Sequence, residues 1–343
     1  MNEQEQGFVY VQTNDAEINE VVVYRRGADG RLERLGRYIT GGKGSGKPHL
    51  ASQGSVVLAD GRLFVANAGS DDVTVFRVED DELVALDLSP SGGSAPTSVA
   101  VNGDFVYVLN TGDRPNVTGF RLGADGRLNA VAGSARELGA GSDPAQAAFS
   151  PDGRTLLVTD RASDAIHVFA IGADGRPKAQ ATEPSLGATP YGFDFTPDGT
   201  VVVTEAAGAE VGKASASSYR VNGGGGLAPV SGAIPNTRSE VCWAVVGKDG
   251  RTAFVTNFGD GTISTYAVGE DGRIELRDAV AATTIDGEPG IRDEAISSDG
   301  RYLYALHADA REVYAWEVGD GGTLRPLGSA NGLPATAAGL AAS

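Results

Sequence analysis

The sequence of 343 residues predicts an all-β fold built from a repeated hairpin unit. Asp-Gly, or a glycine-rich equivalent, recurs along the chain, for example at residues 60–61, 152–153 and 249–250. The flanking segments, such as "TLLVTD" and "TISTYAV", alternate apolar and polar residues and are rich in β-branched and aromatic side chains, which is typical of short half-buried strands. No segment shows the apolar period of a helix. We therefore expect the Asp-Gly pairs to form tight type I′ turns between antiparallel strands.

Every second turn marks the start of a new unit. Such a unit has four strands in roughly fifty residues, which is the size of a propeller blade. The second strands of the units are predicted to start near seven positions, at Phe8, Leu63, Phe105, Leu156, Val201, Ala253 and Leu303. The sequence therefore predicts a seven-bladed β-propeller of four-stranded antiparallel blades.

The chain begins and ends in the middle of a repeat. The first unit lacks a first strand, whereas the C-terminal segment "PATAAGLAAS" is similar to first strands such as "PTSVAVNG". We expect the C-terminal strand to join the N-terminal blade, because this closes the ring and removes a free strand edge. The prediction is one domain over residues 1–343, with blades at approximately 7–38 plus 334–343, 50–88, 96–132, 144–182, 190–232, 240–281 and 291–329.

Charge and composition narrow the classes of partner. The formal charge is −17 and the 28 Lys and Arg residues form no stripe, which opposes binding to nucleic acid or to an anionic membrane. The single Cys242 excludes an intramolecular disulfide framework. The start "MNEQEQG" lacks the regions of a signal peptide. We expect a soluble monomer acting on a small molecule, cytoplasmic as written, or secreted or periplasmic if a leader was removed.

Two whole repeats, "SPDGRTLLVTDRASDAIHVFAIGADG" and "SSDGRYLYALHADAREVYAWEVGDGG", resemble those of the seven-bladed lactonase-type propellers. That family includes 6-phosphogluconolactonases and carboxymuconate cyclases, and the resemblance covers nearly the whole chain. It implies an enzyme that hydrolyses or forms the lactone ring of a small carboxylate or sugar-derived substrate in the central pocket, with His, Arg and Glu side chains doing the chemistry. The candidate residues below come instead from breaks in the repeat.

Two registers of the repeat are expected to face the end of the ring opposite the Asp-Gly turns, because alternate strands run antiparallel. The first register closes each second strand and consists of Thr13, Asn67, Asn110, Asp160, Glu205, Asn257 and His307. The second enters each first strand and consists of Gln53, Thr97, Ala145, Tyr191, Cys242, Arg292 and Ala335, with Trp243, Asp293 and Glu294 as neighbours. Two alternatives remain open: strand-end Asn and Asp commonly bond their own turns, and Arg292 can pair internally with Asp293 or Glu294.

The residues that break these registers are the candidate site. Arg292 is expected to hold a substrate carboxylate or to stabilise a developing oxyanion, because its planar fork suits both tasks. Glu205 or His307 would activate water or move the proton. The remaining candidates are assigned to substrate binding: His49, Gln53, Asp160, Arg161, Tyr191, Trp243, Asp293 and Glu294.

Other chemistries have less support in the sequence. The segment "GGKGSGKP" nearly matches a phosphate-binding loop, but Pro48 replaces the hydroxyl residue and no helix is predicted after it. No serine-hydrolase or zincin motif occurs. Two further hypotheses are a non-catalytic propeller that binds a ligand or a protein, and a metal-dependent lactonase or esterase. No cofactor is expected, with a calcium ion bound in the channel by oxygen ligands as the alternative.

Overall fold

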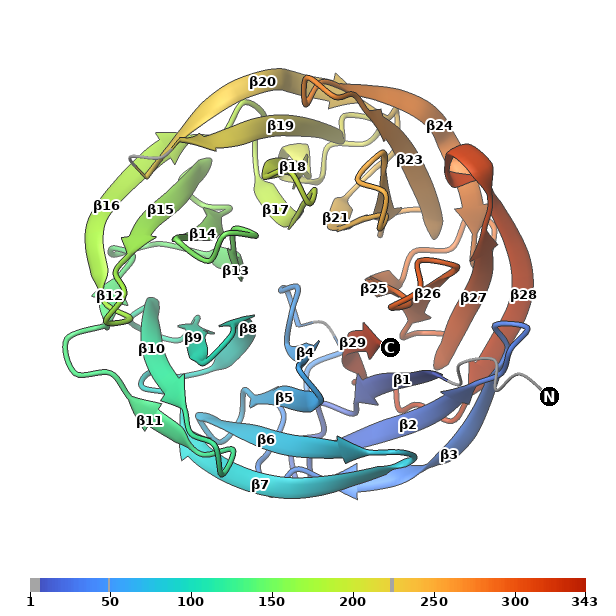
Figure 1. Cartoon of the computed structure of the whole chain (residues 1–343). Helices are drawn as coiled ribbons and strands as arrows, with labels where there is room; N and C mark the ends of the chain where they lie inside the picture. The colour runs from blue at the N-terminus through green and yellow to red at the C-terminus, as the bar shows by residue number, and fades with distance from the viewer. Residues whose placement is uncertain (1–6, 49, 223–224) are drawn as a thin grey trace.

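The computed structural model describes residues 7–48, 50–222 and 225–343. In this part of the chain seven antiparallel sheets stand side by side in a ring around a central channel (Figure 1). Six sheets have four strands, and the third has a fifth short strand that pairs with its third strand. The predicted seven-bladed, all-β propeller is confirmed.

The first strand of each blade lies next to the channel (Figure 1). In order from blade one to blade seven, these inner strands are β29 (Ala338–Ala342), β4 (Val56–Ala59), β8 (Pro96–Asn102), β13 (Pro144–Phe149), β17 (Pro190–Phe195), β21 (Val241–Val246) and β25 (Ile291–Ile296). Each inner strand pairs with only one other strand, so its second backbone edge faces the channel.

The second strand of each blade is almost entirely buried, and each begins within one residue of its predicted start. In the same order, the second strands are β1 (Gly7–Gln12), β5 (Arg62–Asn67), β9 (Phe105–Asn110), β14 (Thr155–Asp160), β18 (Thr200–Glu205), β22 (Thr252–Asn257) and β26 (Tyr302–His307). Their burial follows from packing against neighbouring blades on both faces, which requires apolar residues without strict alternation.

The third and outer strands complete the blades. The third strands are β2 (Glu20–Arg26), β6 (Asp72–Glu79), β10 (Asn116–Leu122), β15 (Ala165–Ile171), β19 (Ser215–Asn222), β23 (Thr262–Val268) and β27 (Glu312–Val318). The outer strands are β3 (Leu32–Ile39), β7 (Glu82–Pro90), β11 (Leu128–Ala130) with β12 (Arg136–Glu137), β16 (Pro177–Pro184), β20 (Gly226–Pro235), β24 (Ile274–Thr283) and β28 (Leu324–Asn331). Two short 3₁₀ turns, η1 (Ala207–Ala209) and η2 (Asp320–Gly322), lie between strands.

The Asp-Gly turns differ in part from the type I′ prediction. At Asp60 and Gly61 both φ angles are positive, 47° and 69°, as that turn requires. In the turn between β13 and β14 only Gly153 has a positive φ, of 68°. There the Asp152 carboxylate accepts hydrogen bonds from the Ser150 hydroxyl and the Arg154 amide. The Asp152 side chain therefore stabilises this longer turn. The sequence alone did not distinguish such a turn from a two-residue hairpin.

The C-terminal strand closes the ring as predicted. β29 pairs antiparallel with β1, with Val11 opposite Leu340 and Val9 opposite Ala342. The last residue continues this pairing, because the Ser343 amide donates to the Phe8 carbonyl at 2.9 Å. Blade one therefore contains strands from both ends of the chain (Figure 1).

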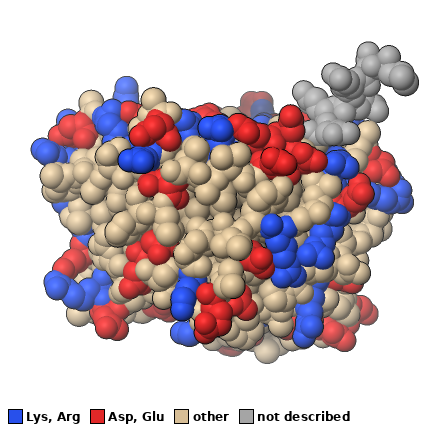
Figure 2. Space-filling model, turned by 90° about the horizontal axis from the view of Figure 1, so that it is seen from below, with Lys and Arg blue, Asp and Glu red and all other residues tan. Residues whose placement is uncertain are grey.

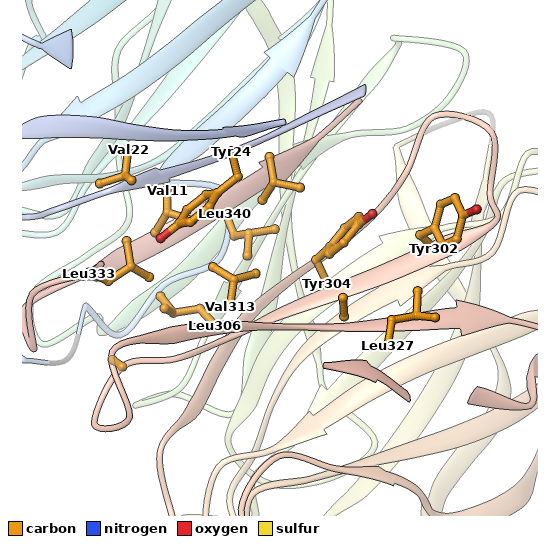
Figure 3. Packing of buried hydrophobic residues seen from close by; sticks show 14 residues of the cluster. Val11, Val22, Tyr24, Tyr302, Tyr304, Leu306, Val313, Leu327, Leu333 and Leu340 are labelled. Carbon is orange, nitrogen blue, oxygen red and sulfur yellow. The ribbon is translucent and has the colours of Figure 1, made fainter. Parts of the chain in front are cut away.

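The hydrophobic core lies between blades rather than inside one sheet. At the junction of blades seven and one, Leu306 and Tyr304 pack with Val11 and Leu340 (Figure 3). The Tyr304 hydroxyl also donates to the carbonyl of Gly30, in the turn of blade one, at 3.0 Å. The junction that joins the two ends of the chain is thus packed and hydrogen-bonded like an interior junction.

Polar side chains of several inner strands link one blade to the next. Each reaches the unpaired backbone edge of the following inner strand: Ser98 to Ala147, Gln146 to Phe193, Asp194 to Val246, and Asp293 to Gly339. These bonds satisfy backbone groups that no strand pairs, which explains polar residues on otherwise apolar strands.

The outer surface mixes both signs of charge. Acidic and basic side chains alternate over the face seen in Figure 2, without a continuous basic stripe. In the described ranges, no helix is long and apolar enough to cross a membrane.

Replacing Leu340 by alanine should destabilise the ring. Leu340 is 6 % exposed and packs at the closing junction, so Leu340→Ala is expected to lower the free energy of unfolding by about 2 to 4 kcal/mol. Leu88, which is 46 % exposed, provides a matched control, and Leu88→Ala should cost less than about 0.5 kcal/mol. Urea denaturation measures both. Equal losses of unfolding free energy in the two variants would show that packing of β29 does not stabilise the closed ring.

Candidate functional site

A loop of blade two crosses one mouth of the channel. The chain leading into β4 reaches into the middle of the ring (Figure 1) and contacts blade six on the far side. The Trp243 indole donates to the Ser52 carbonyl at 3.1 Å. The Gln53 amide donates to the Ala244 carbonyl at 2.8 Å and accepts from the Ala244 amide at 3.1 Å. His49, the other candidate of this segment, lies outside the described residues.

Beside this loop, aromatic and charged side chains from blades four to seven form one cluster. We define the mouth cluster as Ala51, Gln53, Asp143, Ala145, Arg161, Tyr191, Cys242, Trp243, Phe258, Arg292 and Asp309. It joins five of the residues predicted from the sequence: Gln53, Arg161, Tyr191, Trp243 and Arg292. They converge because each enters a first strand or follows a second strand at the same end of the ring.

Two aromatic rings and an arginine form one side of the mouth cluster. Tyr191 and Trp243 meet edge to face, with centroids 5.8 Å apart. The Arg161 guanidinium lies 4.8 Å from the centre of the Tyr191 ring and pairs with the Asp143 carboxylate at 2.6 Å. Such amphipathic rings beside a fixed guanidinium can bind a sugar or a carboxylate.

Arg292 is the least compensated charge of the mouth cluster. Its side chain is 4 % exposed, and its only ion pair in the described residues is with Asp309, at a loose 3.6 Å. The guanidinium also faces the Phe258 ring at 5.7 Å, while its Nε and Nη1 atoms are buried without a hydrogen-bond partner. Burial lowers the pKa of Arg292, but arginine remains a cation, so two donors are left for a ligand.

The ion pair proposed from the sequence differs from the one observed. Asp293 and Glu294 follow Arg292 on β25, and neither forms an ion pair with it; the described partner is Asp309, in the loop between β26 and β27. Neighbouring side chains of a strand point to opposite faces, so Asp293 turns away from Arg292. Glu294 would return to the face of Arg292 on a regular strand, but the pairing register of β25 shifts between these two residues.

Cys242 and Tyr191 stay protonated at neutral pH. Burial raises the pKa of the Cys242 thiol, and burial raises the pKa of the Tyr191 phenol. The thiol points to the Glu240 carbonyl at 3.3 Å. Neither group is therefore an activated nucleophile, and the carboxylates of Asp143 and Asp309 are the acceptors in the cluster.

The first predicted register does not form a ring at the mouth. Asn67 donates to Asp72 at 2.7 Å and to Thr74 at 2.8 Å in its own blade, and it accepts from Asn19 of blade one at 2.8 Å. Asn257 bonds Ser264 of its own blade at 2.9 Å in the same way. Local bonding, one of the two alternatives left open by the sequence, is what the structure shows for these asparagines.

Asp160 follows this local pattern. It accepts hydrogen bonds from the Ser142 hydroxyl, the Asp143 amide at 2.9 Å and the His167 ring at 3.3 Å. Burial disfavours its charge, but the bonds from His167 and Ser142 outweigh burial and hold the pKa of Asp160 below its usual value. The carboxylate oxygens of Asp160 are therefore used in hydrogen bonds within blade four.

Glu205 is also held inside its own blade. It is fully buried and accepts from the Gly187 amide at 2.9 Å, the Ser215 hydroxyl at 2.6 Å, and the Ser185 and Ser217 hydroxyls. Burial raises the pKa of Glu205 despite these bonds. Four donors in blade five and in the loop that leads into it satisfy the Glu205 carboxyl group. Glu205 is therefore not part of the mouth cluster.

His307 lies close to the mouth cluster but is constrained. Its Nδ1 accepts from the Ala310 amide at 3.2 Å, which places the proton of the neutral ring on Nε2. Nε2 is buried without a partner. Burial lowers the pKa of His307, against the opposing charge of Asp309. In this tautomer the ring can donate a hydrogen bond through Nε2 but has no free nitrogen to accept a proton.

Asp293 and Glu294 lie further along the channel. Both line a cavity of about 320 Å³ formed by β4, β8, β13, β25 and β29. Burial raises the pKa of Asp293 to about 7 and that of Asp194, on β17, to about 6. Burial raises the pKa of Glu294 well above its usual value, and Asp194 and Asp293 add to the effect. Gln53 of the mouth cluster lines the same cavity, so these acids adjoin the mouth cluster at the loop that carries Gln53.

Sequence reasoning missed several members of the site. Asp143 and Asp309 come from loops and are recognisable only by their arginine partners. Asp194 had a visible signal, because it interrupts the apolar strand "YGFDF". The glycine-rich segment 41–48 is structural: the amides of Gly44 and Gly46 bond the carbonyls of Asp15 and Asn14, and no helix follows.

The described residues contain no group of three His, Cys, Asp or Glu side chains close enough to hold a metal ion. The oxygen ligands suggested from the sequence for calcium, Asp160 and Glu205 among them, are bonded within separate blades.

The family sequence profile described as "Lactonase, 7-bladed beta-propeller" matches residues 3–135 and 117–207. These ranges span more than half of the chain, which therefore belongs to the seven-bladed lactonase family. No curated protein sequence gives a significant match.

Solved structures share the fold at low identity. A putative 6-phosphogluconolactonase of Bacteroides fragilis is 17% identical, with a TM-score of 0.78 over 100% of this chain and 99% of that one. A periplasmic gluconolactonase of Pseudomonas aeruginosa is 19% identical, with a TM-score of 0.76 over 98% of both chains. At this sequence identity the likeness shows the fold alone. The substrate and the mechanism must be argued from the residues of the site.

Removing the Gln53 side chain should loosen the loop across the mouth. Gln53→Ala deletes two hydrogen bonds to blade six, so the free energy of unfolding should fall by about 1 to 3 kcal/mol. Residues 50–54 should also exchange amide hydrogens faster. The exposed Gln180 on β16 provides a matched control, and Gln180→Ala should change neither measurement. Unchanged exchange in Gln53→Ala would mean that other contacts hold the loop.

Asp293 should make stability fall as the pH rises. Its folded pKa of about 7 exceeds the unfolded value of about 3.9, so between these values the folded state keeps a proton that the unfolded state has released. Stability is therefore lost from about pH 4 upward, until the pH passes the folded pKa. In urea unfolding, Asp293→Asn should show a smaller decline across this window than wild type, whereas exposed Asp286→Asn should match wild type. Identical slopes for Asp293→Asn and wild type would contradict the raised pKa.

Proposed function

We propose that the protein hydrolyses the lactone ring of a small sugar-derived substrate at the mouth cluster. The observation that carries this proposal is Arg292, whose Nε and Nη1 atoms are buried without a hydrogen-bond partner and whose guanidinium faces the Phe258 ring. Burying two donor nitrogens without acceptors costs folding free energy, and a ligand that accepts hydrogen bonds from them would offset that cost. Membership of the lactonase family and the gluconolactonase-like fold support the reaction class.

The geometry suggests a division of roles. Arg292 donates to the lactone carbonyl oxygen and stabilises the oxyanion that forms when water adds to the carbonyl carbon. Asp309, half exposed and 3.6 Å from the guanidinium, accepts the proton of that water. The bond from the carbonyl carbon to the ring oxygen then breaks, the ring oxygen takes the proton back from Asp309, and a hydroxy acid is released.

The remaining residues of the mouth cluster would bind and orient the substrate. Tyr191, against which the fully buried Trp243 packs, would contact a sugar ring, and Arg161 offers a donor fixed by Asp143. Because the free nitrogens of Arg292 are buried, the substrate reaches them only when a neighbour such as Phe258 moves aside. The proposal assigns no proton transfer to Glu205 or to His307 Nδ1, which are hydrogen-bonded in place.

Phosphorylated lactones fit this cluster less well than neutral ones. Arg161 and Arg292 each face a carboxylate, Asp143 and Asp309, so the two pairs leave no net positive charge for a phosphate dianion. The formal charge of −17 also repels anions approaching from solution.

The test is lactone turnover in Arg292→Gln. With glucono-δ-lactone as substrate, and with the uncatalysed rate subtracted in a pH-stat assay, kcat/KM should fall by about 10² to 10³ because an oxyanion donor is lost. Arg238, paired with Asp260 in the corresponding loop of blade six, is the matched control, and Arg238→Gln should retain wild-type turnover. Full activity in Arg292→Gln would reject the proposed role.

A non-catalytic binding propeller is the second candidate. It is favoured by the lack of an activated nucleophile in the described mouth cluster, since Cys242 and Tyr191 are protonated. Under this alternative, wild type turns over no lactone but binds gluconate saturably, and Arg292→Gln loses that binding.

A further inference from the structure

The half of the channel next to the Asp-Gly turns contains a second polar site. We call it the lower channel and define it by the cavity of about 320 Å³ that Asp293 and Glu294 line. Its walls come from the later parts of β4, β8 and β13, which lead into those turns, and from the end of β29. Gln53 lines this cavity and also belongs to the mouth cluster, so the loop that carries it is the boundary between the two.

Glu294 is the unexplained group of the lower channel. It is 4 % exposed, and both of its carboxyl oxygens are buried without a hydrogen-bond partner. By contrast, Asp293 accepts from the Gly339 amide at 2.6 Å, and Asp194 accepts from the Val246 amide at 2.7 Å. A buried carboxyl with neither donors nor a counter-charge is rare in native proteins and marks a place where a ligand can supply both.

The surroundings indicate what kind of ligand would fit. Asp293 and Glu294 line the cavity, and Asp194 lies close enough to raise the pKa of Glu294. A bound cation can replace the protons that burial keeps on these acids, so positive charge is the ligand charge that fits here. The rest of the wall is largely apolar and includes Val99, Ala147 and Leu340. A cavity of this volume is at the lower end of the range for small-molecule sites and is much larger than one ion.

We propose that the lower channel binds a small organic cation, a primary ammonium group with a short apolar tail, through Glu294, whose carboxyl group releases its proton to solvent when the cation binds. The ammonium group has three N–H donors and a positive charge, so it supplies the hydrogen bonds and the counter-charge that no neighbouring residue gives Glu294. The tail contacts the aliphatic wall. A metal ion is disfavoured because no three acidic, His or Cys side chains of the described chain come close enough to coordinate it. The proposal does not depend on lactone hydrolysis, since it concerns the other end of the channel.

The experiment is isothermal titration calorimetry of the full chain with n-butylammonium chloride. We expect a dissociation constant on the order of millimolar or tighter, as for other fragment-sized ligands. Butanol and butyrate, which have a similar tail but no positive charge, should show no saturable binding. Glu294→Gln should weaken butylammonium binding by about tenfold or more, whereas Glu275→Gln, an exposed acid on β24, should bind as wild type does.

Three outcomes would overturn the proposal: no binding of butylammonium, equal affinity in wild type and Glu294→Gln, or saturable binding of calcium chloride in its place. Hydrogen exchange of wild type locates the ligand independently of any variant. Butylammonium, but not butanol, should slow amide exchange at residues 99–101 and 147–149, which line the cavity. Protection confined to residues 242–243, which belong to the mouth cluster and do not line the cavity, would place the ligand at the mouth and reject the lower channel as its site.

Discussion

The packing of each blade against two neighbours is the constraint on which the rest of this structure depends. Each sheet is apolar on both faces, so an unclosed ring would expose one face of its first blade and one of its last. β29 prevents this by giving blade one an inner strand from the other end of the chain. The hydrophobic effect that stabilises every interior junction therefore also holds the two ends of the chain together.

Closure also determines where charge can be tolerated. Most buried polar groups are satisfied by their own blade, as Glu205 is, or by the next inner strand, as Asp194 is. Arg292 and Glu294 are the described ionisable side chains with several buried, unpartnered atoms, and they carry opposite charges. They are two residues apart on β25, yet Arg292 belongs to the mouth and Glu294 to the lower channel. Burying these two groups lowers the free energy of unfolding. A rigid ring can retain them because its many contacts between blades offset this loss.

The two sites differ in how their charges are balanced. The mouth cluster pairs each arginine with an exposed carboxylate, so a ligand there meets aromatic faces and hydrogen-bond donors more than net charge. The lower channel is lined by two acids, Asp293 and Glu294, with Asp194 nearby, and no ion pair joins any of them to another described residue. One narrow pore thus presents two chemically different ends, divided by a loop that three hydrogen bonds hold to blade six.

The sequence by itself determined the number of blades, the places where strands begin, the closing strand and the membership of Tyr191, Trp243 and Arg292 in one mouth. These features follow from local periodicity and from the repeat, which place equivalent residues at the same end of the ring. Only the tertiary structure decided which polar side chains face the channel. Glu205 and Arg292 both break the repeat, but four donors of its own blade surround the first, whereas two atoms of the second have none. Whether a side chain is already satisfied depends on donors that lie far from it in the sequence, and a repeat pattern carries no information about them.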